Sequence, residues 1–210
     1  MQRFGETGES HVLGLERAVW DEGIVRIAGV DEVGRGCLFG DVVAGAVILP
    51  PGLVIEGIND SKKLSEKKRE YLYDIIAEQA ISWSVAHVDA ETVDRINIKQ
   101  AARLAMKLAV ESLSVSAQYL LVDAEKIDLE LPQQAIIKGD ATSQSIAAAS
   151  IMAKVTRDRL CAGEWEQQYP HYGIAIHKGY ATKLHQQRLL EMGPSPLHRR
   201  MFLRKLLGEV

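Results

Sequence analysis

The spacing of apolar residues predicts a chain that alternates between short strands and helices. Apolar runs at 24–30, 42–49 and 81–88 are rich in β-branched residues and end at glycine, proline or polar residues, as strands do. The connection between the first two runs is short enough for antiparallel neighbours. Apolar residues three and four positions apart predict helices in five segments, 10–20, 65–80, 98–113, 143–160 and 182–192, before a basic last helix. The pattern therefore indicates an α/β fold.

Acidic residues follow three of the apolar runs. Asp31 and Glu32 come directly after the first run, Asp123 is the last residue of an apolar strand at 119–123, and Asp140 closes a third copy of the pattern. Neighbours on a pleated strand point to opposite faces, so we expect the first strand to end at these acids if both serve one site. Ligands of α/β sheets bind beyond the carboxyl ends of strands, so the acids converge if their strands are neighbours.

A glycine-flanked arginine follows the first pair of acids. Gly34 and Gly36 permit positive φ and a close approach of the backbone to a ligand. Between them, Arg35 presents a planar fork that suits phosphate. A polar turn with solvated acids would have the same local sequence, and this stretch by itself leaves both interpretations open.

The chemistry of the acids favours a hard cation. They have no cysteine or histidine cluster among them, and carboxylate oxygens suit Mg²⁺ or Mn²⁺. Four carboxylates that lie close together would raise one another's pKa unless cations offset their charge. Spacing alone does not show that the four acids meet.

Composition narrows the class of protein. The chain has 210 residues, of which 47% are hydrophobic and 25% charged, as in ordinary globular proteins. The sequence has neither an apolar run of the roughly 20 residues that span a bilayer nor the apolar core of a signal peptide at its start. Cys37 and Cys161 are far apart and without metal-ligand spacing, so we expect reduced thiols and a cytoplasmic protein. A monomer is the default expectation for the oligomeric state.

Charge is unevenly distributed. The net charge of −3 argues against a protein that coats nucleic acid. From Pro170 onward, however, Lys and Arg outnumber Asp and Glu, so the tail is basic and the body acidic. A basic tail favours a polyanion partner, although a solvated helix face has the same charge. We expect a single catalytic domain over 1–210, in which 165–210 forms a basic C-terminal helical extension.

Seven motifs in register resemble those of bacterial type 2 ribonuclease H, ribonuclease HII. They lie at 31–36 (DEVGRG), 59–64 (NDSKKL), 121–123 (LVD), 137–140 (IKGD), 145–158 (SIAAASIMAKVTRD), 177–180 (HKGY) and 193–194 (GP). Each motif is weak alone, but together they run from about Ile27 to Arg200 in the order of the family.

The resemblance implies an RNase H-like fold, with a mixed β-sheet flanked by helices. It also implies an endonuclease that cuts the RNA strand of RNA/DNA hybrids and single ribonucleotides embedded in duplex DNA, leaving 3′-OH and 5′-phosphate ends. By this resemblance Asp31, Glu32, Asp123 and Asp140 are the catalytic carboxylates and bind two Mg²⁺ or Mn²⁺ ions. Such ions, about 4 Å apart, would activate the attacking water and stabilise the leaving 3′ oxygen.

The resemblance also assigns residues that bind the substrate. The turn Gly34, Arg35 and Gly36 matches the element that reads the ribose 2′-OH, the group that distinguishes RNA from DNA locally. Tyr180 matches the tyrosine that packs on the sugar after the junction. Phosphate contacts are matched by Ser61, Lys62 and Lys63.

Some positions depart from the family or carry simpler roles. The family commonly has proline where this chain has Cys37 and Asp41, and glycine where it has Ala124. We interpret Asp158 as an ion-pair partner near the arginines of its own helix rather than as a fifth metal ligand. His177 is interpreted as structural or close to a phosphate.

Two other classes of function remain open on the sequence. A non-catalytic hybrid-binding module would need the basic tail and Arg35 but not four acids. Another divalent-metal nuclease of the RNase H-like fold, such as a Holliday-junction resolvase or an exonuclease, would cluster acids. It would give no reason for the glycine-arginine-glycine turn beside them.

Overall fold

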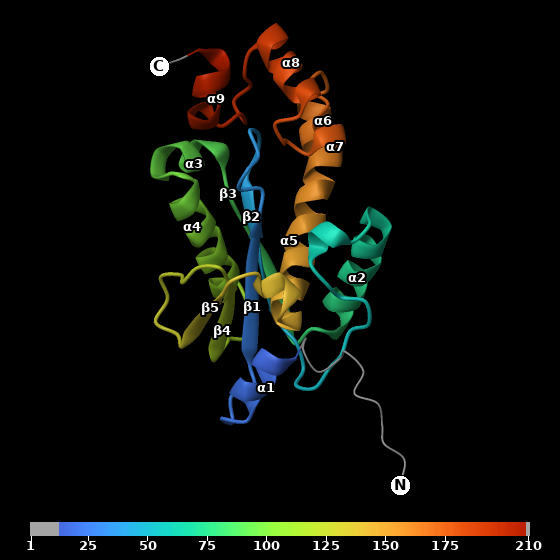
Figure 1. Ribbon diagram of the computed structural model, residues 1–210, viewed down its shortest axis with the longest axis vertical. Coiled ribbons are helices and arrows are strands. Elements are labelled where there is room, and N and C mark those ends of the chain that lie inside the picture. The colour runs from blue at the N-terminus through green and yellow to red at the C-terminus, as the bar shows by residue number, and fades with distance from the viewer. Residues whose placement is uncertain (1–12, 209–210) are drawn as a thin grey trace.

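A five-stranded mixed sheet forms the centre of the molecule (Figure 1). The computed structural model describes residues 13–208. Its strands, in the sheet order β3-β2-β1-β4-β5, are β3 Ser82–Val88, β2 Val42–Ile48, β1 Ile27–Val33, β4 Tyr119–Asp123 and β5 Gln133–Ile136. β1 pairs antiparallel with β2, as predicted, and parallel with β4. β3 is antiparallel to β2, and β5 is parallel to β4.

Helices cover both faces of this sheet. The α-helices are α1 Gly14–Trp20, α2 Glu66–Gln79, α3 Ala90–Ile96, α4 Ile98–Glu111, α5 Gln144–Ala162, α6 Glu164–Gln168, α7 Ile174–His177, α8 Lys183–Met192 and α9 Arg200–Leu207. Short 3₁₀ turns occupy Ser61–Lys63 and Gly139–Ala141. In Figure 1, α4 lies on one side of the sheet, and α5 with α2 lies on the other. The predicted α/β fold with flanking helices is confirmed.

The small side chains of α4 and α5 allow both helices to pack closely on the sheet. The alanines of α4, within the helix predicted for 98–113, are buried in a core cluster with β1, β2 and β4. On the other face, α5 lies against the backbone of β1 and β2. A Cβ at Gly29 would overlap the backbone carbonyl of Ser145, and one at Gly45 would overlap that of Ala149. The two glycines therefore set how closely α5 approaches the sheet.

Side-chain caps fix the starts of the long helices. Ser65 and Ser143 accept hydrogen bonds from backbone amides of the first turns of α2 and α5. The buried carboxylate of Glu16 on α1 accepts from Ser143 Oγ, at 2.6 Å, and from the amide of Ser145, at 3.0 Å. An acid at a helix N-terminus is favoured by the helix dipole, so α1 fastens the start of α5.

Some predicted boundaries differ from the structure. The first predicted helix, 10–20, is observed as α1 from Gly14, and residues 10–12 lie outside the described residues. The short helices α3, α6 and α7 were not predicted, since segments of four to seven residues carry too little periodicity. Within residues 13–208, no helix is long and apolar enough to cross a membrane.

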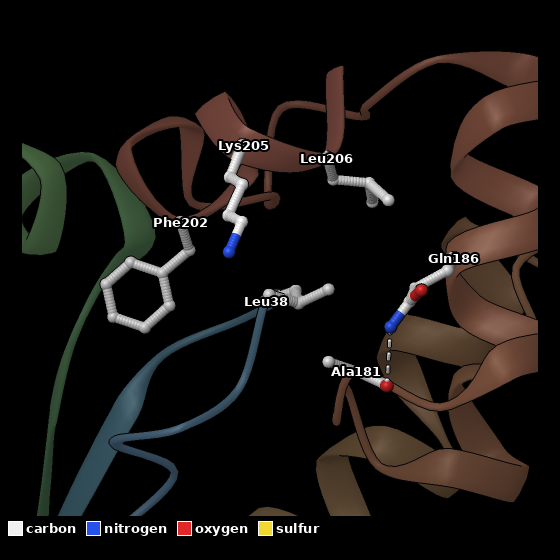
Figure 2. A pocket seen from close by; sticks show the side chains of 6 residues that line it. All are labelled: Leu38, Ala181, Gln186, Phe202, Lys205 and Leu206. Atoms are coloured by element: carbon white, nitrogen blue, oxygen red, sulfur yellow. Dashed lines mark hydrogen bonds between the residues drawn. The ribbon is translucent and has the colours of Figure 1, made fainter. Parts of the chain in front are cut away.

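The C-terminal helices pack at one end of the sheet, around a buried cluster that includes Phe39, Trp165 and Leu203. Figure 2 shows a pocket of about 400 Å³ beside this cluster. It is lined by Leu38, Ala181, Gln186, Phe202, Lys205 and Leu206. None of these six is acidic, so this pocket is separate from the predicted acidic site.

Ala124 adopts a backbone conformation that favours glycine, with φ of 57°. The left-handed region costs an L-residue roughly 1–2 kcal/mol, part of which glycine loses again through its freer unfolded chain. We therefore expect Ala124→Gly to raise the free energy of unfolding by about 0.5–1 kcal/mol in urea denaturation. Ala162→Gly, at an exposed helical position, is the control and should lower it. Destabilisation by Ala124→Gly would contradict the assigned strain.

Candidate active site

Three acids meet where the pairing of β1 with β4 ends. The parallel register pairs Val30 with Val122 as its last residues, so Asp31 and Asp123 come next on adjacent strands. The expectation that the first strand ends at its acids is wrong. β1 continues to Val33, because β2 still pairs with it through Asp31↔Gly45 and Glu32↔Ala44. Asp31, Glu32 and Asp123 share a site because β4 ends at Asp123, beside the acids of β1.

Asp140 joins the group from a turn rather than from the end of a strand. β5 ends at Ile136, and Lys138 in the left-handed conformation, with φ of 57°, reverses the chain into the 3₁₀ turn that carries Asp140. The amide of Gly139 donates to Oδ1 of Asp123 at 2.7 Å. This hydrogen bond holds the Asp140 turn against the end of β4. The predicted third strand ending in an acid is therefore wrong in form, although Asp140 lies beside Asp123.

Burial and mutual repulsion raise the pKa of three of these acids. Asp31 is only 4% exposed, and burial together with the charges of Glu32 and Asp123 raises its pKa well above the usual value. Burial also raises the pKa of Glu32, against the opposing effect of Arg35. For Asp140, burial raises the pKa, and the charges of neighbouring Asp60 and Asp123 add to it. The site holds more negative charge than its surroundings offset.

Cations lie at the edge of the acidic group. Arg35 Nη1 is 3.2 Å from Glu32 Oε1, and its Nη2 is 3.6 Å from Glu125 Oε1. Lys62 Nζ is 3.9 Å from Asp140 Oδ2, and its side chain is largely exposed. The side chains of both cations are exposed, at 38% for Arg35 and 77% for Lys62, so both can exchange partners when an anion arrives.

The donor set suits a divalent cation. All four candidate ligands are carboxylates, the hard oxygen donors that Mg²⁺ and Mn²⁺ prefer. Burial, with a smaller contribution from neighbouring acids, raises the pKa of Asp31, Glu32 and Asp140, and a bound cation would offset both effects. In residues 13–208, however, no three His, Cys, Asp or Glu side chains are arranged as a ready metal cage. The carboxylate oxygens are suitable ligands for a divalent cation, but the four side chains would have to move toward one another to coordinate it.

The two glycines of the turn after β1 differ in their surroundings. Gly34 has φ of 90°, and a Cβ there would lie 2.5 Å from Nε of Arg157. Gly36 needs no positive φ, and a Cβ there would meet no atom within 4 Å among the described residues. Gly34 is therefore required by the fold itself. Gly36 leaves an open approach to the backbone.

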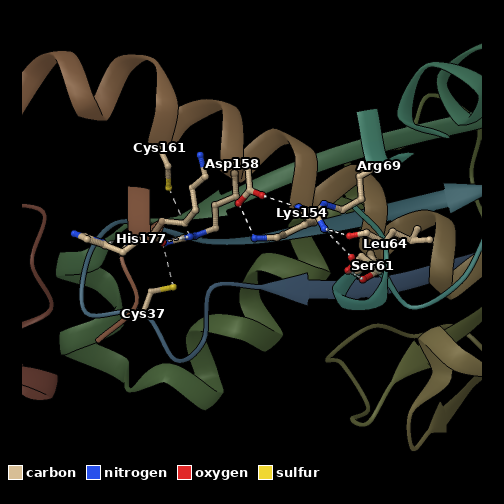
Figure 3. Close-up of polar contacts among 12 residues, drawn as sticks. Cys37, Ser61, Leu64, Arg69, Lys154, Asp158, Cys161 and His177 are labelled. Atoms are coloured by element: carbon tan, nitrogen blue, oxygen red, sulfur yellow. Dashed lines mark hydrogen bonds and ion pairs between the residues drawn. The ribbon is translucent and has the colours of Figure 1, made fainter. Parts of the chain in front are cut away.

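The predicted phosphate-binding residues take different positions. Ser61 is buried, and its hydroxyl lies 2.9 Å from that of Ser150 (Figure 3). Lys62 reaches toward Asp140, whereas Lys63 pairs with Asp60 at 3.8 Å. Of the three, Lys62 is the side chain that the structure brings to the acids.

Tyr180 lies beside a cluster of charged side chains on the other flank of the site. Its ring is 5.9 Å from Nζ of Lys154, which also binds Asp158 at 2.7 Å (Figure 3). Arg69 is the second partner of Asp158, at 3.6 Å. Asp158 is thus an ion-pair partner, but of Lys154 and Arg69 rather than of the arginines beside it. Lys154 lies one helical turn after Ser150 on α5, and its position near Tyr180 was not predicted.

A chain of neutral histidines fixes the backbone of Tyr180. His185 Nδ1 lies 2.9 Å from the carbonyl of Tyr180, and its Nε2 is 3.0 Å from Nε2 of His198. His198 Nδ1 accepts from the amide of Ser195 at 2.9 Å. Burial lowers the pKa of His185 to about 4 and that of His198 to about 3, so both are neutral at pH 7. His177, the predicted structural histidine, stacks on His185.

Comparison with known proteins gives one consistent family. A family model described as Ribonuclease HII matches residues 28–205. A Ribonuclease HII of Alkaliphilus metalliredigens is 60% identical over 93% of this chain and 98% of the relative. The crystal structure of the ribonuclease H2 from Pyrococcus horikoshii has a TM-score of 0.73 at 27% identity, covering 87% of this chain and 97% of that one. Bst-RNase HIII in complex with Mn²⁺ shares the fold, with a TM-score of 0.64 at 18% identity, over 88% and 70% of the two chains.

The charge imbalance predicts that divalent cations stabilise the protein. Binding to the folded state alone raises stability by about 1.4 kcal/mol at ten times the dissociation constant. For a chain of this size that corresponds to roughly 3–6 °C in melting temperature. We expect this rise in millimolar Mg²⁺ or Mn²⁺ relative to EDTA, measured by thermal denaturation.

Two variants serve as the test and its control. Asp31→Asn with Asp123→Asn should abolish the rise. Asp128→Asn, which changes an acid that pairs only with Lys107 among the described residues, should keep it. A parent protein whose melting temperature is the same in EDTA would contradict cation binding by the acids.

Proposed function

The chain belongs to the ribonuclease HII family and cleaves RNA in RNA/DNA hybrids. We propose that Asp31, Glu32, Asp123 and Asp140 are the carboxylates that perform this cleavage. The observation that carries the proposal is their convergence at the end of the β1–β4 pairing, where burial and the charges of neighbouring acids raise the pKa of Asp31 and Asp140. The resemblance of the motifs at 31–36, 121–123 and 137–140 to those of the family assigns the same four acids.

The chain acts as a divalent-metal nuclease, and we assign it two Mg²⁺ or Mn²⁺ ions held by these four carboxylates. Bound ions of this kind activate the attacking water and stabilise the leaving 3′ oxygen. The hydrogen bond from the amide of Gly139 orients Asp123 for this task. The backbone amide of Glu32 does the same for Asp31, whose Oδ1 accepts from it at 2.8 Å.

Arg35 would exchange its carboxylate partners for a substrate phosphate. Without substrate it holds Glu32 and Glu125. A substrate phosphate offers its fork a bidentate partner, which is stronger than a single contact to a carboxylate. Release of Arg35 from Glu32 then frees that carboxylate for the cation. Lys62, close to Asp140, is placed to take a neighbouring phosphate.

The substrates in this proposal are RNA/DNA hybrids and duplex DNA with single embedded ribonucleotides. The backbone of the turn 34–36 would read the ribose 2′-OH, since the side of Gly36 is open to a close approach. Tyr180, which is partly exposed, would pack on the following sugar. The segments that carry these two elements are in contact: Cys37 Sγ is 3.6 Å from the carbonyl of Lys178, and the amide of Leu38 donates to the carbonyl of Gly179 at 2.8 Å.

The remaining assignments concern the whole chain. We propose that 1–210 acts as one catalytic domain, in which the basic segment 165–210 contributes to the affinity for the duplex, and that the protein works as a cytoplasmic monomer. The packing of α8 and α9 against Leu38 and Phe39 supports one domain. The free and buried thiols of both cysteines are consistent with a reducing compartment.

Replacement of Asp123 tests the catalytic assignment. Asp123→Asn keeps the shape of the side chain and removes its charge. We expect turnover of an RNA/DNA hybrid to fall by about 100-fold or more, the scale of a lost electrostatic contribution to the transition state. Affinity for the hybrid should change little. The control is Asp128→Asn, and near-normal turnover of Asp123→Asn at saturating Mg²⁺ would refute the role of Asp123.

Replacement of Gly36 tests the reading of the ribose. Gly36→Ala should leave the melting temperature unchanged, because its methyl group meets open space and its φ is not positive. It should nonetheless weaken the preference for a duplex with one ribonucleotide over the same duplex with 2′-deoxy or 2′-O-methyl, since the methyl group holds the sugar away. A site built to hydrogen-bond a hydroxyl group rejects the analogue that lacks it by a factor on the order of 10⁴ or more.

Two matched variants make this result specific. Gly14→Ala adds the same methyl group into open space far from the turn. It should leave the ribose preference unchanged and slightly raise the melting temperature, because Gly14 is the first residue of helix α1 and alanine favours a helix. Gly34→Ala should lower the melting temperature, because its φ of 90° is unfavourable for alanine. An unchanged preference and rate in Gly36→Ala would remove the turn from the proposal.

A further inference from the structure

Two arginines of this protein are completely buried. Arg157 on α5 and Arg199, just before α9, have no exposed surface. Within residues 13–208, neither forms an ion pair with a carboxylate. A buried and unpaired charge costs several kcal/mol unless hydrogen bonds offset the loss of water. The partners of these two groups therefore show what the fold uses them for.

Arg199 binds the carbonyl groups of the turn that follows β1. Its Nη1 donates to the carbonyls of Gly34 at 2.6 Å, Arg35 at 3.2 Å and Cys37 at 2.9 Å. Its Nε donates to the carbonyl of Gly40 at 2.9 Å. One guanidinium group thus holds four carbonyls within seven residues of chain.

Arg157 holds the next part of the same segment. It donates to the carbonyls of Phe39 at 2.9 Å, Asp41 at 3.1 Å and Lys178 at 2.7 Å. The third contact links the segment to the turn that leads to Tyr180. The two arginines together fasten both elements of the proposed substrate surface from inside the protein.

The amides of the turn are left for another partner. In the described part of the chain, no hydrogen bond is donated by the backbone amides of Arg35 or Gly36. Peptide dipoles whose carbonyls face a buried cation present their amides elsewhere, and successive free amides form a concave site for an acceptor or an anion. The open space beside Gly36 gives a ligand access to them.

We propose that Arg199 is a positioning residue for substrate recognition, which fixes the turn 34–36 so that its amides bind the ribose 2′-OH. The inference rests on the proposed reading of the ribose by this turn. The planar fork of arginine is required, because the contacts use Nε and Nη1 in fixed relative directions, and the single ammonium group of lysine cannot reproduce them. Arg199 itself is held by its own amide, which donates to the carbonyl of Leu38 at 2.8 Å.

The test separates recognition from stability. Arg199→Lys keeps the charge and removes the fork. Leu203→Ala is the matched control, because Leu203 is also fully buried beside the turn but offers it no hydrogen bond. Its truncation should lower the melting temperature, because it leaves a cavity in a buried cluster. The measured quantity is the ribose preference, taken as Ki of an all-DNA duplex, used as a competitor, divided by KM of the same duplex with one ribonucleotide.

This ratio does not depend on how much of the enzyme is folded, since unfolded molecules contribute to neither constant. We expect Arg199→Lys to lower it by about tenfold or more, the effect of a misaligned pair of hydrogen bonds, with a lower kcat. Leu203→Ala should keep the ratio of the parent despite a lower melting temperature. A parental ratio in Arg199→Lys would overturn the inference.

A second measurement uses the parent protein and so does not require the variant to fold. In EDTA, the NMR signal of the Arg199 Nε–H group should shift when the duplex with one ribonucleotide is added, and less with the all-DNA duplex. Equal shifts with both duplexes would also overturn the inference. Gly36→Ala distinguishes the two levels of the account. If it too keeps the parental ratio, the turn does not read the ribose, whereas a loss confined to Gly36→Ala removes the role of Arg199 alone.

Discussion

The close contact of α5 with β1 and β2 is the constraint on which the site depends. Gly29 and Gly45 let the backbone of the helix lie directly on the sheet. This contact fixes the position of α5 relative to β1 and to the acids that β1 carries. Successive turns of α5 then supply Ser150 next to Asp31, Lys154 near Tyr180, and Arg157 behind the turn after β1. A side chain at either glycine would separate all of these groups at once.

Opposite charges are buried at the acidic site and behind the turn that follows β1. At the site, burial and repulsion raise the pKa of Asp31, Glu32 and Asp140, which destabilises the folded protein at neutral pH unless a cation binds. Behind the turn, Arg157 and Arg199 are buried against backbone carbonyls. The fold therefore keeps acids that favour a cation next to a rigid turn that favours an anion or a hydroxyl. A ribonucleotide phosphodiester with its bound cations satisfies both.

Local patterns predicted most of the fold, and long-range pairing explains what they missed. The strands, the caps at Ser65 and Ser143 and the alanine face of α4 follow from spacing over a few residues. The continuation of β1 through Asp31 and Glu32 depends on β2 remaining its partner after β4 has stopped, which no local pattern contains. The turn that carries Asp140 depends on a left-handed Lys138, a residue with no special preference for that conformation. Arg199 lies in a basic segment, where its burial against Gly34 could not be distinguished from a solvated charge.

The central claim is that Asp31, Glu32, Asp123 and Asp140 together hold the catalytic cations. The most direct test is a crystal structure with Mn²⁺ and a hybrid duplex, in which anomalous scattering locates the metal independently of the protein. The account predicts Mn²⁺ peaks within coordination distance of these carboxylates, with the scissile phosphate between Lys62 and the turn 34–36. Mn²⁺ bound elsewhere, with the four carboxylates uncoordinated in the presence of the duplex, would contradict it.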